Sequence, residues 1–268
     1  YLSVDPNFTA GVFLRTPIES LFRLSFGNAM IFETHAHYDD SRFDDDREEL
    51  LKKVHDSGVS PIINVGASIE STGTTLELAK THDYIYAAVG VHPSDISGLN
   101  EDSFEWLREQ TNYAKTVAIG EIGLDYYWDK EPGVQEAQRY WFGRQLDLAK
   151  ETGLPVIIHS RDAAEDTMQV MKEHEAQKIP GVIHCYSYSK ELAGEFVKMG
   201  YFIGVGGVVT FKNARKLVET VEAIPMEHIL LETDCPYMAP EPYRGKRNQS
   251  SYIRYVAEKI AEIRYPAI

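Results

Sequence analysis

Cysteine is scarce in this 268-residue chain, which holds only Cys185 and Cys235. Two thiols cannot form the disulfide framework of a small secreted domain, and they are too few for a zinc ribbon. The chain also has no apolar run long enough to span a bilayer, so the sequence predicts no transmembrane helix. Residues 1–29 lack the basic and apolar segments of a secretory signal. Together these absences favour a cytoplasmic protein that does not bind membranes.

Positive charge is also in short supply. The chain has 27 lysines and arginines against 41 aspartates and glutamates, which gives a formal net charge of −14. Such a surplus of negative charge argues against a protein whose whole surface grips nucleic acid. It leaves room for an enzyme that holds a phosphodiester locally, through metal ions and a few cations.

From residue 31 onward, short apolar runs alternate with longer amphipathic segments. The short runs are mostly β-branched and apolar on both faces, which is typical of buried parallel strands. They cover residues 31–34, 61–65, 85–89, 116–120, 155–158, 181–183, 201–205 and 229–232. The amphipathic segments have helical spacing and cover residues 47–57, 71–81, 103–112, 134–152, 163–174, 190–199, 214–222 and 250–263.

Eight strands alternating with eight helices predict the α/β class and a single-domain (β/α)₈ TIM barrel over residues 30–268. An open, doubly wound sheet is the alternative. The even spacing and the lack of a glycine-rich nucleotide-binding motif disfavour it. Residues 1–29 are treated as an N-terminal extension to which the sequence assigns no role.

Polar side chains gather where the predicted strands end. In a parallel barrel, the carboxyl ends of the strands and the loops after them form the active site. The residues at these positions are His35, His37, His92, Glu121, His159, His184 and Asp234. Five of the nine histidines therefore fall at one end of the expected barrel. This segregation predicts a metal site there.

The donors at this end are too many for one tetrahedral ion. They are the imidazoles of His35, His37, His159 and His184 and the carboxylates of Glu121 and Asp234. Such a set suits two divalent ions about 3.5–4 Å apart, with one carboxylate between them. Nitrogen and oxygen donors without thiolate favour Zn²⁺, Mn²⁺ or Mg²⁺ over Ca²⁺. Two divalent ions per chain are therefore the expected cofactors.

Several short motifs identify a family by their combination and order. They are Glu33-Thr34-His35-Ala36-His37-Tyr38-Asp39, Gly90-Val91-His92-Pro93, Gly120-Glu121-Ile122-Gly123-Leu124-Asp125-Tyr126, His159-Ser160-Arg161, His184-Cys185-Tyr186, Glu232-Thr233-Asp234-Cys235-Pro236 and Pro242-Tyr243-Arg244-Gly245-Lys246-Arg247-Asn248. With these motifs the chain resembles the TatD-type metal-dependent deoxyribonucleases, from Met30 to about Arg264.

The resemblance implies an amidohydrolase-like barrel that carries two divalent ions and hydrolyses phosphodiester bonds in DNA. It implies that one ion is held by His35, His37 and Asp234, the other by His159 and His184, with Glu121 between them. The chain departs from the family at two places. The family usually has Asp where this chain has Glu33, and it calls for another helix after Arg264, so the last helix is expected to be missing.

The expected reaction is attack on phosphorus by a water molecule that the two ions activate. Asp234 is the candidate general base, and Glu121 is the second catalytic carboxylate. His92 and Arg161 are candidates for substrate contact because each lies close to a strand end. The alternatives are a hydrogen bond within its own loop for His92 and a salt bridge with Asp162 or another loop carboxylate for Arg161.

The densest basic cluster in the chain is Arg244, Lys246 and Arg247, which follows the last predicted strand. We predict that Arg244 and Arg247 contact substrate, because backbone phosphates supply most of the affinity for nucleic acid. The alternative is a solvated turn whose charges offset nearby carboxylates. DNA or another phosphodiester is the expected partner, and the sequence indicates no obligate protein partner.

Two other functions remain open from the sequence. The first is an amidohydrolase or phosphotriesterase-like hydrolase of a small ester, amide or phosphodiester. Such sites usually bridge their metals with a carboxylated lysine at a strand end, whereas Lys115 lies at the wrong end of its strand and Glu121 occupies the bridging place. The second is a non-catalytic barrel that binds metal, which the complete donor set and the candidate base argue against.

Overall fold

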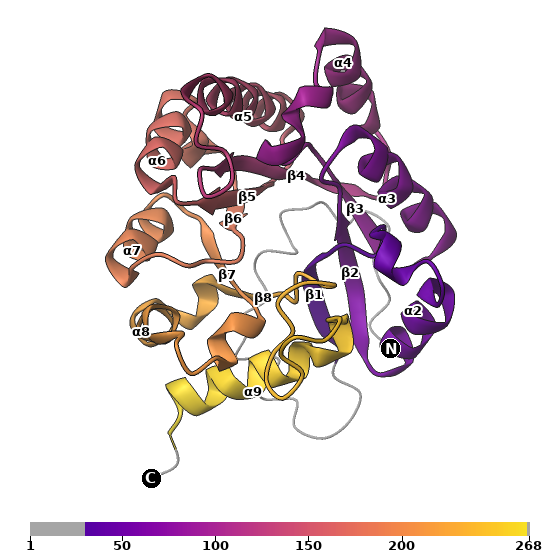
Figure 1. Cartoon of the computed structure of the whole chain (residues 1–268), viewed down its shortest axis with the longest axis vertical. Helices are drawn as coiled ribbons and strands as arrows, with labels where there is room; N and C mark the ends of the chain where they lie inside the picture. Colours follow the sequence, from indigo (N-terminus) through magenta and orange to yellow (C-terminus); the bar gives the residue numbers. More distant parts are fainter. Residues whose placement is uncertain (1–29, 267–268) are drawn as a thin grey trace.

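Eight parallel strands pair in chain order in the computed structural model, which describes residues 30–266 (Figure 1). The strands are β1 (Ile31–Ala36), β2 (Val59–Val65), β3 (Ile85–Val89), β4 (Thr116–Asp125), β5 (Val156–Arg161), β6 (Gly181–Ile183), β7 (Phe202–Val205) and β8 (Ile229–Leu231). The N-terminal extension expected over residues 1–29 lies outside the described residues.

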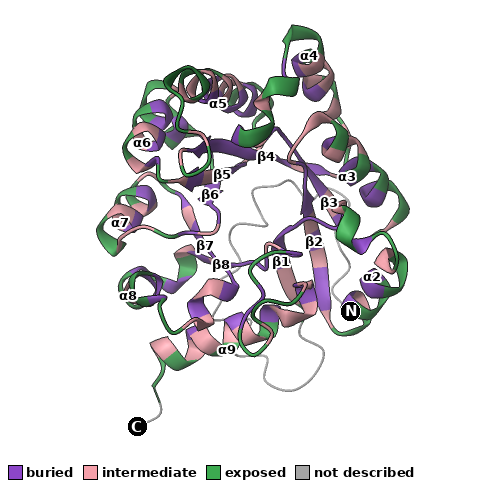
Figure 2. Ribbon diagram, in the orientation of Figure 1, coloured by how far each residue is buried: buried purple, intermediate pink, exposed green. Residues whose placement is uncertain are grey.

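A helix follows each strand and packs on the outside of the sheet (Figure 1). These helices are α2 (Arg47–Asp56), α3 (Ile69–Thr81), α4 (Glu101–Gln110), α5 (Pro132–Thr152), α6 (Ala164–Glu173), α7 (Lys190–Lys198), α8 (Arg215–Ala223) and α9 (Ile253–Arg264). Burial divides each helix into an inner and an outer face, and the strands are mostly buried (Figure 2). The predicted (β/α)₈ barrel in a single domain is confirmed.

Two helices begin earlier than the apolar pattern predicts because of capping boxes. The Ser68 hydroxyl accepts a hydrogen bond from the Ser71 backbone N–H at 3.0 Å, and the Ser71 hydroxyl accepts one from the Ser68 N–H at 3.1 Å. Asn100 and Ser103 form the same reciprocal pair at the start of α4. Since the serine is the third helical residue in each box, α3 and α4 begin two residues before the predicted starts at 71 and 103.

The barrel closes where β1 meets the segment that follows β8. The Asp234 N–H donates to the His35 carbonyl at 2.9 Å, and the His37 N–H donates to the Cys235 carbonyl at 2.8 Å. The Thr34 hydroxyl donates to the Leu231 carbonyl at 2.7 Å. Closure therefore brings Asp234 beside His35 in the first strand and His37 directly after it.

Strand β4 runs to Asp125, five residues beyond the predicted end at residue 120. Its register against β5 shifts between Ile119 and Ile122, which marks a bulge around Glu121. Bulges next to active sites change the direction of a side chain. Gly123 has φ +141°, and a Cβ there would lie 1.9 Å from the His159 carbonyl oxygen, so only glycine fits.

Helix α9 follows β8 and packs against α8. The further helix that the resemblance calls for after Arg264 would lie outside the described residues, which end at residue 266. Within residues 30–266, no helix has the length and the apolar composition needed to cross a bilayer.

Candidate metal centre

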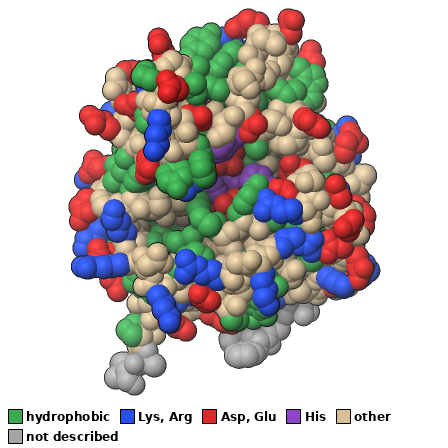
Figure 3. All heavy atoms as spheres, viewed as in Figure 1, with side chains coloured by type: hydrophobic (Ala, Val, Ile, Leu, Met, Phe, Trp, Pro, Cys, Tyr) green, Lys and Arg blue, Asp and Glu red, His purple; other side chains and the backbone are tan. Residues whose placement is uncertain are grey.

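A polar cleft opens at the carboxyl ends of the strands, and histidines lie at its base (Figure 3). The side chains that line it are His37, Asp39, Asp40, Ala67, Ser68, Ser71, His92, Ser94, Asp95, Glu121, Asp125, Trp128, His159, Arg161, His184, Asp234 and Tyr237. His35 lies beneath them and is fully buried. The structure thus brings all six donors expected from the sequence to one place.

The first group of donors surrounds one oxygen of Glu121. The Nε2 atoms of His35 and His37 lie 3.0 Å apart, and Glu121 Oε2 lies 3.4 and 3.6 Å from them. Asp234 Oδ1 completes the group at 3.4 Å from His37 Nε2 and 3.8 Å from His35 Nε2. His35 lies in β1 and His37 directly after it, Glu121 lies in β4, and Asp234 lies in the segment after β8.

The second group surrounds the other oxygen of Glu121. Oε1 lies 2.8 Å from His159 Nδ1 and 3.2 Å from His184 Nε2. His92 Nε2 is 3.8 Å from the same oxygen. The two oxygens of one buried carboxylate therefore face two different sets of imidazoles.

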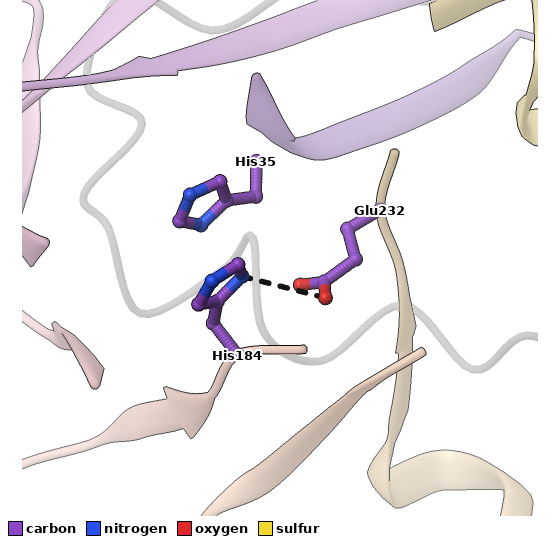
Figure 4. Close-up of side chains that lie close together, drawn as sticks. All are labelled: His35, His184 and Glu232. Carbon is purple, nitrogen blue, oxygen red and sulfur yellow. Dashed lines mark ion pairs between the residues drawn. The ribbon is translucent and has the colours of Figure 1, made fainter. Parts of the chain in front are cut away.

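The far nitrogen of three of the four predicted histidine ligands meets an oxygen. His37 Nδ1 lies 2.8 Å from the Val65 carbonyl, and His159 Nε2 lies 3.1 Å from Asp125 Oδ2. His184 Nδ1 lies 3.4 Å from Glu232 Oε1 (Figure 4). The same oxygen accepts a hydrogen bond from the Cys185 N–H. Oxygen partners of this kind orient metal-binding imidazoles and raise their basicity.

Asp125 and Glu232 were missed among the candidate site residues of the sequence analysis. Both stand inside its quoted motifs, Asp125 at the end of β4 and Glu232 directly after β8. A carboxylate at a strand end beside another strand's histidine is the signal that could have identified them. Their side chains are almost fully buried, so each needs a positively polarised partner.

The chemistry of these donors fits a bound cation. Since a carbonyl only accepts hydrogen bonds, His37 Nδ1 carries the proton when the ring is neutral, and the Nε2 lone pair points at His35 Nε2, Glu121 and Asp234. Burial opposes a charge on His37, but its contacts with Asp234 and Glu121 outweigh burial and raise the pKa to about 9. The pocket thus attracts positive charge, which a divalent ion would supply.

His92 can donate a hydrogen bond from Nε2 into the cleft. Its Nδ1 accepts a hydrogen bond from the Ser94 N–H at 3.1 Å, the loop contact that the sequence left as the alternative role. Burial and the neighbouring His159 lower the pKa of His92 to about 3, so the ring is neutral near pH 7. With Nδ1 accepting, the proton sits on Nε2, which can donate toward an oxygen in the cleft.

The three arginines named by the sequence have different surroundings. Arg161 lines the cleft with its guanidinium 3.9 Å from the Tyr127 ring centre, and no ion pair with Arg161 occurs among residues 30–266. Arg247 makes a two-pronged ion pair with Asp46, at 2.8 and 2.6 Å. The guanidinium of Arg244 lies 4.1 Å from the Phe211 ring centre. Neither Arg244 nor Arg247 is among the residues that line the cleft.

Metal binding is expected to strengthen as the pH rises from 6.5 to 8.5. His37 keeps its proton up to a pKa of about 9, and an ion has to displace that proton. Affinity should therefore rise about tenfold per pH unit for each proton displaced. In protein without metal, the stabilisation from charged His37 is complete below pH 6.5 and is lost as the pH rises through about 9.

Titration of metal-stripped protein with Mn²⁺ at three pH values, with released protons counted by an indicator dye, measures this dependence. His82→Gln serves as the control, because His82 lies outside the cleft at the end of α3. An affinity that stays level across this range would contradict the proposed ligand role of His37.

Comparison with known proteins agrees with this geometry. A family model described as TatD related DNase matches residues 32–267. The uncharacterized metal-dependent hydrolase YabD of Bacillus subtilis is 45% identical over 235 residues, which cover 88% of this chain and 91% of YabD. The uncharacterized metal-dependent hydrolase TatD of Mycobacterium tuberculosis is 32% identical over 239 residues, 86% of this chain and 89% of that protein.

Among solved structures, YjjV, a TatD homolog from Escherichia coli K12, superposes with a TM-score of 0.82 at 34% identity. The match covers 88% of this chain and 91% of YjjV. The family model spans most of the chain, and the relatives align over most of their own length. The resemblance drawn from the motifs is therefore confirmed, and the chain belongs to the TatD-related family of metal-dependent hydrolases.

Proposed function

We propose that this protein is a phosphodiesterase that hydrolyses DNA at a centre of two divalent metal ions. The observation that carries the proposal is the position of Glu121, whose two oxygens face two different sets of imidazoles. A carboxylate between two groups of donors suits a pair of ions that clamp one phosphodiester. The match to a family model named for a DNase supports DNA as the substrate.

Each ion has its own donors in this proposal. One set is His35, His37 and Asp234, the other is His159 and His184, and Glu121 belongs to both. The nitrogen and oxygen donors fit Zn²⁺, Mn²⁺ or Mg²⁺. When bound, such ions polarise a phosphodiester and lower the pKa of water.

Asp234 has the position and charge of a general base. Its side chain lines the cleft and is 17% exposed, more than that of Glu121. Burial works against ionisation, but His37 and the other imidazoles outweigh it and lower the pKa of Asp234. The carboxylate is therefore ionised at neutral pH and can orient a water molecule and accept its proton.

Arg161 and His92 supply hydrogen-bond donors for the phosphate. The guanidinium of Arg161 lines the cleft without a carboxylate partner in the described part of the chain, so its charge is available to a phosphate oxygen. His92 offers the neutral Nε2–H on the other side of Glu121 from His35 and His37. These groups bind and orient a phosphodiester in a cleft that is otherwise rich in carboxylates.

The purified protein is expected to bind two Mn²⁺ or Zn²⁺ ions per chain and to cleave an end-labelled single-stranded oligonucleotide when they are present. Six convergent donors exceed the four that one tetrahedral ion needs. Elemental analysis gives the stoichiometry, and gel electrophoresis of the labelled strand gives the cleavage. Protein treated with a chelator and assayed in its presence serves as the control.

Binding of no more than one ion at saturating metal would contradict the two-metal centre. A protein that binds two ions, leaves the oligonucleotide intact and hydrolyses a small ester or amide would instead be a small-molecule hydrolase. In that case the DNA substrate would be wrong, while the metal centre would stand.

Arg161→Ala is expected to weaken oligonucleotide binding. The slope of log K against log[salt] should become shallower by about 0.7, the value for one phosphate contact on a single strand.

Substrate contact by Arg244 and Arg247 stays a prediction, which the double variant with alanine at both positions tests. Fluorescence anisotropy over a range of salt concentrations measures both variants. An unchanged slope for Arg161→Ala would contradict the phosphate contact.

A further inference from the structure

Large aromatic side chains stand exposed at the rim of the polar cleft. Trp128 is 68% exposed and Tyr237 is 47% exposed, and both line the cleft. Their loop neighbours Tyr127 and Met238 are exposed to 43% and 45%. These exposed side chains gain no stabilisation from packing within the protein. Exposed apolar surface beside a cleft is typical of a site where a ligand binds.

The two aromatic residues stand on opposite sides of the barrel mouth. Trp128 lies in the loop that follows β4, and Tyr237 lies in the loop that follows β8. In an eight-stranded barrel with strands in chain order, β4 and β8 are four strands apart and face each other across the mouth. The carboxylates of Glu121 and Asp234, two of the proposed metal donors, line the same cleft.

An arginine lies against each aromatic ring. The Arg42 guanidinium lies 4.1 Å from the Tyr237 ring centre and pairs with Asp40 through two hydrogen bonds. The Tyr237 hydroxyl donates to the same carboxylate at 3.2 Å. On the other side, Arg161 lies 5.6 Å from the Trp128 ring centre. These contacts hold the rings in place without burying them.

We propose that Trp128 and Tyr237 are stacking platforms that hold unpaired bases on either side of the phosphate undergoing hydrolysis. The proposal rests on the nucleic-acid substrate proposed above and identifies residues that select its form. A base offers an apolar π-face of the size of these rings, whatever its identity. A paired base is stacked on its neighbours and cannot offer that face, so the two residues favour a single strand.

The charges at the two rims differ in a way that agrees with this role. Arg42 is neutralised by Asp40, so it supports the Tyr237 ring and adds little attraction for phosphate. Arg161 has no such partner in residues 30–266 and stands beside Trp128, where it can bind a phosphate next to the stacked base. With a net charge of −14 on the chain, stacking would supply affinity that electrostatics does not.

The test compares an ordinary single-stranded oligonucleotide with an abasic strand of the same length, which keeps the phosphates but lacks bases. Trp128→Ala and Tyr237→Ala should each raise KM for the ordinary strand by about tenfold and leave KM for the abasic strand unchanged. Trp128→Phe and Tyr237→Phe, which keep a ring, should stay close to wild type. Tyr265→Ala is the matched control, because Tyr265 is 60% exposed and lies outside the cleft.

A binding measurement gives a second readout that needs no turnover. A phosphorothioate strand that resists hydrolysis should quench tryptophan fluorescence of the wild-type protein, and Trp128→Phe should remove most of that quenching while binding persists. Fluorescence anisotropy follows binding independently. Retained quenching in Trp128→Phe would show that no base stacks on this ring.

The outcomes separate this inference from the proposed function. Equal losses on the ordinary and abasic strands, or no loss on either, would overturn the stacking role while leaving the nuclease activity in place. A wild-type protein that loads two metal ions but hydrolyses neither strand would refute the proposed function instead. If Trp128→Ala and Tyr237→Ala weaken binding and Trp128→Phe and Tyr237→Phe do not, the result would support the stacking role.

Discussion

Replacing Glu121 with glutamine is expected to lower the rate of phosphodiester hydrolysis by about a hundredfold or more while the barrel stays folded. Both oxygens of this carboxylate face imidazoles, Oε1 those of His159 and His184 and Oε2 those of His35 and His37. Glutamine keeps the volume but replaces one oxygen with an NH₂ group, which only donates hydrogen bonds and cannot bind a cation. Mutation of a residue that only hydrogen-bonds to a metal ligand typically lowers metal affinity or activity about ten- to a hundredfold. Mutation of a ligand shared by two ions should therefore lower activity more.

Two matched substitutions give activities with which Glu121→Gln can be compared. Glu232→Gln removes the charge that faces His184 Nδ1 and should lower the rate by about ten- to a hundredfold, because among the proposed ligands Glu232 faces the His184 ring. Glu136→Gln, on the exposed face of α5, should cost nothing. Elemental analysis should find less bound metal in Glu121→Gln, and circular dichroism should find an unchanged fold. Two retained ions with activity within about tenfold of wild type would contradict the bridging role.

The barrel could be predicted from the sequence because its determinants are local. Buried parallel strands have continuous apolar runs, helices have a 3.6-residue apolar period, and both are visible over a few residues. The fixed geometry of a parallel barrel then places the carboxyl ends of all strands at one face. That geometry is why His35, His159 and His184, distant in the sequence, could be expected to converge.

The extension of β4 could not be predicted from local pattern. Glu121, Gly123 and Asp125 have low strand propensity, and they sit where a turn would be expected. Gly123 and Asp125 remain in the strand because β5 pairs with them in register, Gly123 with His159 and Asp125 with Arg161, while Glu121 lies in the bulge just before this paired stretch. Tertiary pairing overrides propensity at this point.

The long-range ion pairs of the charged residues could not be predicted from the sequence either. Arg247 pairs with Asp46, 201 positions away, and nothing in the spacing of either residue indicates the other. The exposure of Trp128 and Tyr237 was also hidden, because an aromatic residue in a loop is as compatible with packing as with solvent. Both facts depend on how the loops fold over the barrel mouth, which composition and period do not encode.

Replacing Asp234 with asparagine is expected to lower kcat by about a hundredfold or more, with KM for the oligonucleotide changed far less. Asparagine cannot accept the proton of an attacking water, and loss of a general base typically costs about 10²–10⁴-fold. A change confined to kcat is the sign of an interaction made in the transition state. If Asp234 acts only as a ligand, bound metal and activity should fall together.

Asparagine is the right replacement because of the backbone at this position. Asp234 has φ +57°, and asparagine is one of the few residues besides glycine that adopt this conformation readily. The Asp234 N–H also donates to the His35 carbonyl at 2.9 Å, a bond that Asp234→Asn keeps and that helps close the barrel. Thermal unfolding of the variant should therefore match wild type, whereas alanine would add backbone strain to the chemical loss. A folded, metal-loaded Asp234→Asn protein with activity within about tenfold of wild type would remove Asp234 from the role of base.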